Sequence, residues 1–85
     1  MTLLRIGTPV IVSMLGVDVD SVITGIRHRG AGRYEYQVKI PNDIEERAGL
    51  DADERVYARL SRNNGGFWYH TSEVSAHAAD REEAL

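Results

Sequence analysis

Cysteine is absent from the 85 residues of this chain. This absence excludes a disulfide framework and any zinc site built on thiolates. Long hydrophobic runs are also missing, since no segment approaches the roughly 20 apolar residues that a membrane-spanning helix needs. The N-terminus has neither the basic start nor the apolar run of a signal peptide. We therefore expect a cytoplasmic protein that makes no contact with a membrane.

An excess of positive charge is lacking as well, because the formal net charge is −3. The first 40 residues carry five basic and three acidic side chains, whereas the rest carry five basic and ten acidic ones. Whole-molecule attraction to phosphate is thus absent, although a local basic patch can still bind nucleic acid. The acidic side chains gather in 43–54 and at the C-terminus, which is typical of solvated segments.

Recognisable catalytic motifs are missing too. The chain has no nucleophile elbow and no glycine loop of the kind that cradles phosphate. Its histidines and its aspartate pairs lack the companion ligands of a zinc or calcium site. We therefore expect no catalytic residues, no cofactor and no metal ion.

The clearest pattern in the chain covers residues 33–40. Large apolar side chains alternate there with polar ones, which is the period of a half-buried β-strand. The apolar positions are Tyr34, Tyr36, Val38 and Ile40.

A second alternating segment, 21–29, precedes this strand across Gly30-Ala31-Gly32. A three-residue hairpin loop with a left-handed glycine joins such strands. The resulting register places Ile26 opposite Tyr36, and Arg27 opposite Glu35 as a cross-strand ion pair. It also places Thr24 opposite Val38 and Val22 opposite Ile40.

Other strands are predicted on both sides of this hairpin. Residues 10–14 form one after Pro9, and 15–20 form an irregular connection with a phase slip near 20–21. A second hairpin is predicted over 56–62 and 67–70, because Asn64-Gly65 favours a tight primed turn. The predicted core comprises Val10, Val12, Val22, Ile26, Tyr36, Val38, Ile40 and Leu60.

One short helical turn is predicted in the acidic connection 41–54. Asn42 and Glu45 have the spacing of a capping box, and Gly49 stands where a helix would stop. The chain after 74 is helix-prone, weakly apolar and acidic. We predict that 1–74 fold as one domain and that 75–85 form a C-terminal helix or tail.

Five short strands with this spacing resemble the SH3-like barrels, which include the Tudor and KOW modules. The resemblance covers roughly residues 7–74 and rests on hydrophobic spacing. The segments that carry it are Gly7 to Val12, Val22 to Ile26, Tyr34 to Val38 and Trp68 to Val74. It implies a mainly β protein with a five-stranded barrel, and it leaves the ligand open.

Two clusters of side chains are candidate binding residues. The first lies at the tip of the hairpin and comprises Arg27, Arg29 and Arg33. The second is predicted on the outward face of the second hairpin, where a tryptophan beside an arginine is typical of interface centres. It comprises Tyr57, Arg59, Trp68 and His70. For Trp68 the alternative is packing beneath 41–54 or the tail.

These observations predict a small non-enzymatic binding module whose partner is another protein. Its size and lack of catalytic motifs are typical of small inhibitors, adaptors or accessory proteins of phages and mobile elements. The alternative is nucleic-acid binding through the arginines and Trp68. A third alternative is a structural subunit that forms homo-oligomers through its edge strands.

Overall fold

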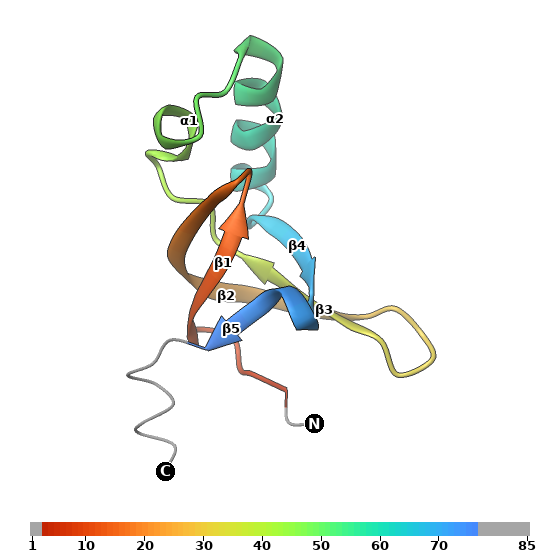
Figure 1. Ribbon diagram of the computed structural model, residues 1–85. Coiled ribbons are helices and arrows are strands. Elements are labelled where there is room, and N and C mark those ends of the chain that lie inside the picture. Colours follow the sequence, from red (N-terminus) through yellow and green to blue (C-terminus); the bar gives the residue numbers. More distant parts are fainter. Residues whose placement is uncertain (1–2, 77–85) are drawn as a thin grey trace.

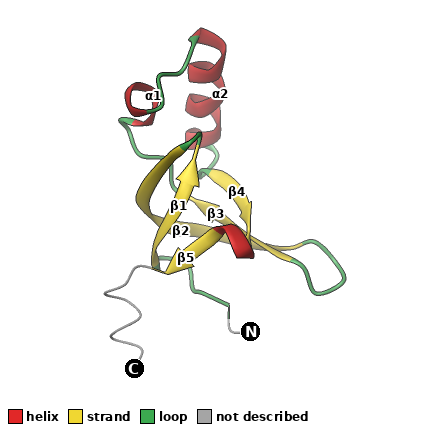
Figure 2. Ribbon diagram, viewed as in Figure 1, coloured by secondary structure: helices red, strands yellow, loops and turns green. Residues whose placement is uncertain are grey.

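The computed structural model describes residues 3–76, which form a mainly β structure with one antiparallel sheet (Figure 1). The order of strands in this open sheet is β4-β3-β2-β1-β5. Two helices lie together at one end of the sheet, between β3 and β4 in the sequence (Figure 2). The elements in chain order are β1 (Pro9–Met14), β2 (Val17–His28), β3 (Tyr34–Val38), α1 (Ile44–Arg47), α2 (Ala52–Asn63), β4 (Phe67–His70), the 3₁₀ turn η1 (Thr71–Glu73) and β5 (Val74–Ala76).

β1 and β2 are joined by a two-residue turn in place of the predicted irregular connection. Leu15 and Gly16 both have positive φ, 51° and 82°, as a tight primed turn requires. The ladder resumes at once, with Met14 opposite Val17. The prediction for 15–20 was wrong because the glycine and aspartates counted against a strand. In the structure the aspartates alternate outward around buried Val19.

The central hairpin of β2 and β3 has the predicted register near its tip. Ile26 lies opposite Tyr36 and Arg27 lies opposite Glu35. Farther from the tip a bulge between Ile23 and Gly25 shifts the pairing. As a result Ile23, rather than Thr24, faces Val38, and the predicted pairing of Val22 with Ile40 is not formed. The phase slip thus lies three residues later than predicted.

The predicted second hairpin is wrong, because residues 52–63 form the helix α2. Asp51 caps it, since its side chain accepts from the Glu54 N–H at 2.8 Å while Glu54 accepts from the Asp51 N–H at 3.1 Å. This capping box stabilises the first turn of the helix. Asn64 has φ −96° and is the C-cap rather than a turn residue. Gly65, with φ 103°, leads the chain out of the helix.

α1 confirms the short helical turn predicted in the 41–54 connection, but its cap differs. Asp43 is the N-cap residue and makes no side-chain cap hydrogen bond. Glu45 bonds Arg62 of α2 instead of closing a capping box with Asn42.

β4 pairs with β3, and after η1 the chain returns to pair β5 with β1. Val12 lies opposite Val74, and Val10 lies opposite Ala76. Of the predicted tail 75–85, the first two residues belong to β5, and 77–85 lie outside the described residues.

The core is built mainly from strand residues, and Ile44, Leu50 and Ala58 join it from the helical segment. It confirms five of the predicted core residues, Val10, Val12, Tyr36, Val38 and Ile40. Val22 and Ile26 are only partly buried. The placement of Leu60 in the core is wrong, because it lies on the outer side of α2 with 58% of its surface exposed. Met14, Val19, Ile23, Ile44, Leu50, Ala58 and Val74 complete the core.

Candidate binding surface

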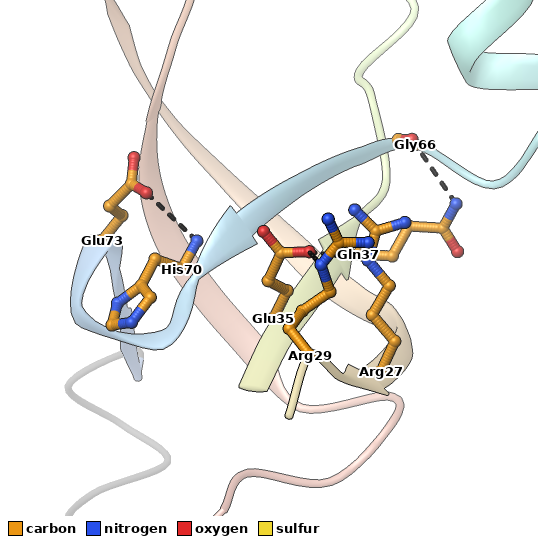
Figure 3. Close-up of polar contacts among 7 residues, drawn as sticks. All are labelled: Arg27, Arg29, Glu35, Gln37, Gly66, His70 and Glu73. Carbon is orange, nitrogen blue, oxygen red and sulfur yellow. Dashed lines mark hydrogen bonds and ion pairs between the residues drawn. The ribbon is translucent and has the colours of Figure 1, made fainter. Parts of the chain in front are cut away.

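The predicted ion pair at the neck of the β2–β3 hairpin is present. Arg27 donates from Nε to Glu35 Oε1 at 2.6 Å, and Arg29 Nε lies 3.6 Å from the same oxygen (Figure 3). Two guanidinium groups therefore share one carboxylate, which leaves a local charge of +1. Arg33 is exposed on the hairpin loop, and its carbonyl accepts from the Arg29 N–H at 2.8 Å.

Trp68 lies on the same outward face of the sheet as this ion pair. The guanidinium carbon of Arg27 is 4.2 Å from the centroid of its ring, which is a cation–π contact. The ring reaches across Gly25, because a Cβ there would lie 3.3 Å from Trp68 Cη2. Trp68 is half-buried, and both Arg27 and Gly25, which its ring approaches, belong to β2. The structure thus joins Arg27 and Trp68, which the sequence placed in separate clusters.

The second predicted cluster is not formed as one strand face. Tyr57 and Arg59 are exposed on α2, whereas Trp68 and His70 belong to β4. The ring of Tyr57 stacks on Phe67 of β4, with centroids 5.5 Å apart. His70 caps η1: its Nδ1 accepts from the Ser72 N–H, and its own N–H donates to Glu73 at 3.0 Å (Figure 3).

The side of α2 that faces the protein is largely polar. Arg55 donates to the Leu50 carbonyl at 3.0 Å, and Arg62 donates to the Pro41 carbonyl at 2.8 Å and to Glu45. Ala58 is the one fully buried residue of the helix. Arginine hydrogen bonds and one small side chain therefore hold α2 in place.

The outer side of α2, by contrast, is apolar. We call it the α2 outer face and define it as Val56, Tyr57 and Leu60, whose exposed fractions are 53%, 61% and 58%. Their spacing of three and four residues puts them on one side of the helix. The usual arrangement of an amphipathic helix is thus reversed.

A groove of about 470 Å³ lies between α2, β4 and the β1–β2 turn. We call it the β4 groove. Arg27 is the only charged side chain among the described residues that line it, and most of the others are aromatic or apolar. The lining residues are Leu15, Arg27, Tyr57, Ser61, Gly66, Phe67, Trp68 and Tyr69.

Two ionisable groups near this surface have shifted pKa values. Burial raises the pKa of Tyr69 to about 12, and the charges of Glu73 and Tyr57 add to this effect. The hydrogen bond from Arg62 lowers the pKa of Glu45. The surroundings therefore favour the neutral form of Tyr69 and the ionised form of Glu45.

No helix in the described part of the chain has the length and apolar character needed to cross a membrane. Within residues 3–76, no three histidine or acidic side chains gather as a metal site would require. No family model, curated protein or solved structure matches the chain.

Sequence reasoning missed Leu15, Val56, Leu60 and Phe67 as surface residues. The signal for α2 was nevertheless present, because Asp51 and Glu54 have capping-box spacing before a helical stripe. The alternation of Val56, Ala58 and Leu60 was taken for the period of a strand. A segment of six residues is too short to separate that period from the period of a helix.

Proposed function

We propose that this chain is a small non-enzymatic binding module of the SH3-like barrel type that acts by binding another protein. The strand connectivity supports the barrel: β2 pairs with β1 along its first part and with β3 along its second, and β5 returns to β1 after a 3₁₀ turn. The proposed contact surface is the α2 outer face together with the adjoining β4 groove.

The observation that carries this proposal is the reversed orientation of α2. Three large apolar side chains are more than half exposed, while arginines of the same helix are turned toward the protein. Water contact with that much apolar surface is unfavourable, and contiguous patches of this kind mark interaction sites. The neighbouring aromatic side chains Phe67 and Trp68 extend the patch onto β4. An inhibitor, adaptor or accessory protein needs such a surface and no catalytic group.

The second candidate function is binding of nucleic acid through Arg27, Arg29, Arg33 and Trp68. The charge balance at Glu35 favours nucleic-acid binding. Arg27 and Arg29 share this one carboxylate, so one positive charge is left uncompensated beside the ring of Trp68. Basic and aromatic side chains together are typical of surfaces that bind single strands.

Affinity capture from a lysate of the source cells, with and without nuclease, separates the two candidates. We expect a defined protein to be retained after nuclease treatment by the wild type and lost by Leu60→Glu. Ile6→Glu is the matched control, since Ile6 is a similarly exposed apolar residue in the segment before β1. Retention should depend weakly on salt.

The opposite pattern would support the alternative. Nuclease-sensitive retention that falls by orders of magnitude between low and moderate salt indicates phosphate contacts. If Leu60→Glu leaves such retention intact, the protein-binding proposal is wrong.

A further inference from the structure

The β4 groove runs along a free edge of the sheet. β4 is the outermost strand, and its one neighbour in the sheet is β3. Side chains from both faces of β4 line the groove: Phe67 and Tyr69 pack toward the core, and Trp68 lies on the outward face. A hollow on one face of a strand would meet side chains of that face alone. The groove therefore follows the edge where β4 has no partner strand.

The hydrogen-bond pattern tells which groups of β4 point to this edge. The Lys39 N–H donates to the Val22 carbonyl just beyond β3, so the odd-numbered residues of β3 bond to β2. Tyr36 and Val38 must then bond to β4, through their partners Tyr69 and Phe67. Trp68 and His70, which alternate with these, turn their backbone groups outward. The His70 N–H confirms this orientation, because it donates to the Glu73 side chain and not to β3 (Figure 3).

The chain itself occupies the N–H groups on either side of Trp68. Glu73 accepts from His70 at one end of the strand, and the Ser61 carbonyl accepts from the Gly66 N–H at 2.9 Å at the other. Residues 3–76 supply no acceptor for the outward N–H of Trp68. Among the described residues, the N–H and the carbonyl of Trp68 thus have no partner in the middle of an edge that is otherwise occupied, and Trp68 lines the β4 groove.

We infer that an extended segment of the partner protein adds to β4 as a sixth, antiparallel strand. This inference rests on the proposed function, the binding of another protein. The partner residue opposite Trp68 would exchange both backbone hydrogen bonds with it. Antiparallel pairing is the more stable arrangement per residue.

The two faces of β4 define the side chains of this segment. The residue opposite Trp68 projects onto the outward face, where Arg27 and Arg29 carry one uncompensated charge, so an acidic side chain fits there. The residues before and after it project to the other face, beside Leu15, Tyr57 and Phe67, so they are apolar. The expected pattern is apolar–acidic–apolar.

The form of the groove favours a bare strand over a second copy of this chain. Leu15 of the β1–β2 turn and Tyr57 of α2 line it together with β4. A second copy that offered its own β4 would also bring its own α2 and β1–β2 turn to the edge that Leu15 and Tyr57 already line.

The test begins with a displayed library of random octapeptides selected against the full 85-residue chain. We expect enrichment of the apolar–acidic–apolar pattern. In the complex with a selected synthetic peptide, hydrogen exchange of the Trp68 amide should slow at least about tenfold, because a free edge N–H becomes bonded. N-methylation of the acidic residue of the peptide, which removes its N–H, should weaken binding at least about tenfold. N-methylation of the next residue, whose N–H points away from β4, should not.

Leu15→Asn gives the matching test on the protein. Asparagine tolerates the positive φ of this turn, so the variant folds while the groove loses an apolar wall. Peptide affinity should fall, whereas Ile6→Asn should leave it unchanged.

Three results would overturn strand addition. The first is a set of selected peptides in which the apolar–acidic–apolar pattern is not enriched. The second is a peptide whose binding leaves Trp68 exchange unchanged and is lost with Leu60→Glu, in which case the protein-binding function stands but uses the α2 outer face. The third is slow Trp68 exchange without peptide that depends on protein concentration, because a second copy would then occupy the edge.

Discussion

Arg62 is the side chain that fixes the position of α2 most directly. It donates to the Pro41 carbonyl at 2.8 Å, and it also bonds Glu45. These bonds join the last turns of the helix to the segment that follows buried Ile40. Because the bonds are made by the planar fork of a guanidinium, lysine cannot reproduce them all.

Replacement of Arg62 should therefore destabilise the fold. We expect Arg62→Ala to lower the free energy of unfolding by about 1–3 kcal/mol, since it leaves carbonyls and a carboxylate without their donor. Arg59→Ala, at an exposed position of the same helix, should change it by less than about 0.5 kcal/mol. Urea unfolding of both variants measures the difference, and equal stabilities would contradict the anchoring role.

Tyr69 should make stability depend on alkaline pH. Its pKa is about 12 in the folded protein, against about 10 in the unfolded chain. The folded state therefore holds this proton more tightly, and the contribution is complete below pH 10. As the pH rises from 10 through 12 the unfolded chain loses the proton first, so stability falls.

Unfolding measured between pH 8 and pH 12, a range set around the reference tyrosine pKa of about 10, should show this fall in the wild type. In Tyr69→Phe the dependence should be shallower, because the titrating group is gone. Tyr34→Phe is the control, since Tyr34 is not among the groups whose charge raises the pKa of Tyr69. If the Tyr69→Phe curve matches that of the wild type, the burial assigned to this hydroxyl is wrong.

Among the elements, the passage from α2 to β4 depends on glycine, and Gly66 is the tighter of its two positions. Gly66 has φ 129°, and a Cβ there would lie 1.9 Å from the Val38 carbonyl oxygen. β4 can approach β3 at this point because that side chain is absent. Gly32, in the β2–β3 loop, also has positive φ, but a Cβ there meets nothing within 4 Å.

Comparison of alanine at these two glycines separates backbone strain from steric overlap. Gly32→Ala should cost about 1–2 kcal/mol, the usual penalty of a left-handed residue. Gly66→Ala should cost at least about 2 kcal/mol more, because the overlap with Val38 adds to the strain. Thermal unfolding monitored by circular dichroism gives both values. A Gly66→Ala variant as stable as Gly32→Ala would mean that β4 lies farther from β3.

The β2–β3 hairpin could be predicted because two independent alternations agreed around one glycine loop. The β1–β2 turn was missed, since Leu15 is a poor residue for positive φ and its conformation is imposed by the flanking ladder. α2 was missed because Asn64-Gly65 signals a helix end as well as a turn. At the site, the pairing of Arg27 with Glu35 followed from register. The contact of Arg27 with Trp68 did not, because it requires the order of the whole sheet.

For the molecule as a whole, Ile40 and Leu60 have opposite environments although both are large and apolar. Both were predicted in the core, yet Ile40 is fully buried and Leu60 is mostly exposed. Ile40→Ala should lower the free energy of unfolding by about 2–5 kcal/mol. Leu60→Ala should change it by less than about 0.5 kcal/mol. Denaturant unfolding measures both changes. A large loss of unfolding free energy in Leu60→Ala would mean that Leu60 is buried after all.

The pairing of β5 with β1 also affects how this module can be built into larger proteins. Val10 lies opposite Ala76, so the chain enters and leaves the sheet on adjacent strands. A host protein can therefore carry these residues as an insert in one of its surface loops without separating the ends of that loop. The same geometry suits circular permutation, with new ends opened in the exposed loop around Ala31.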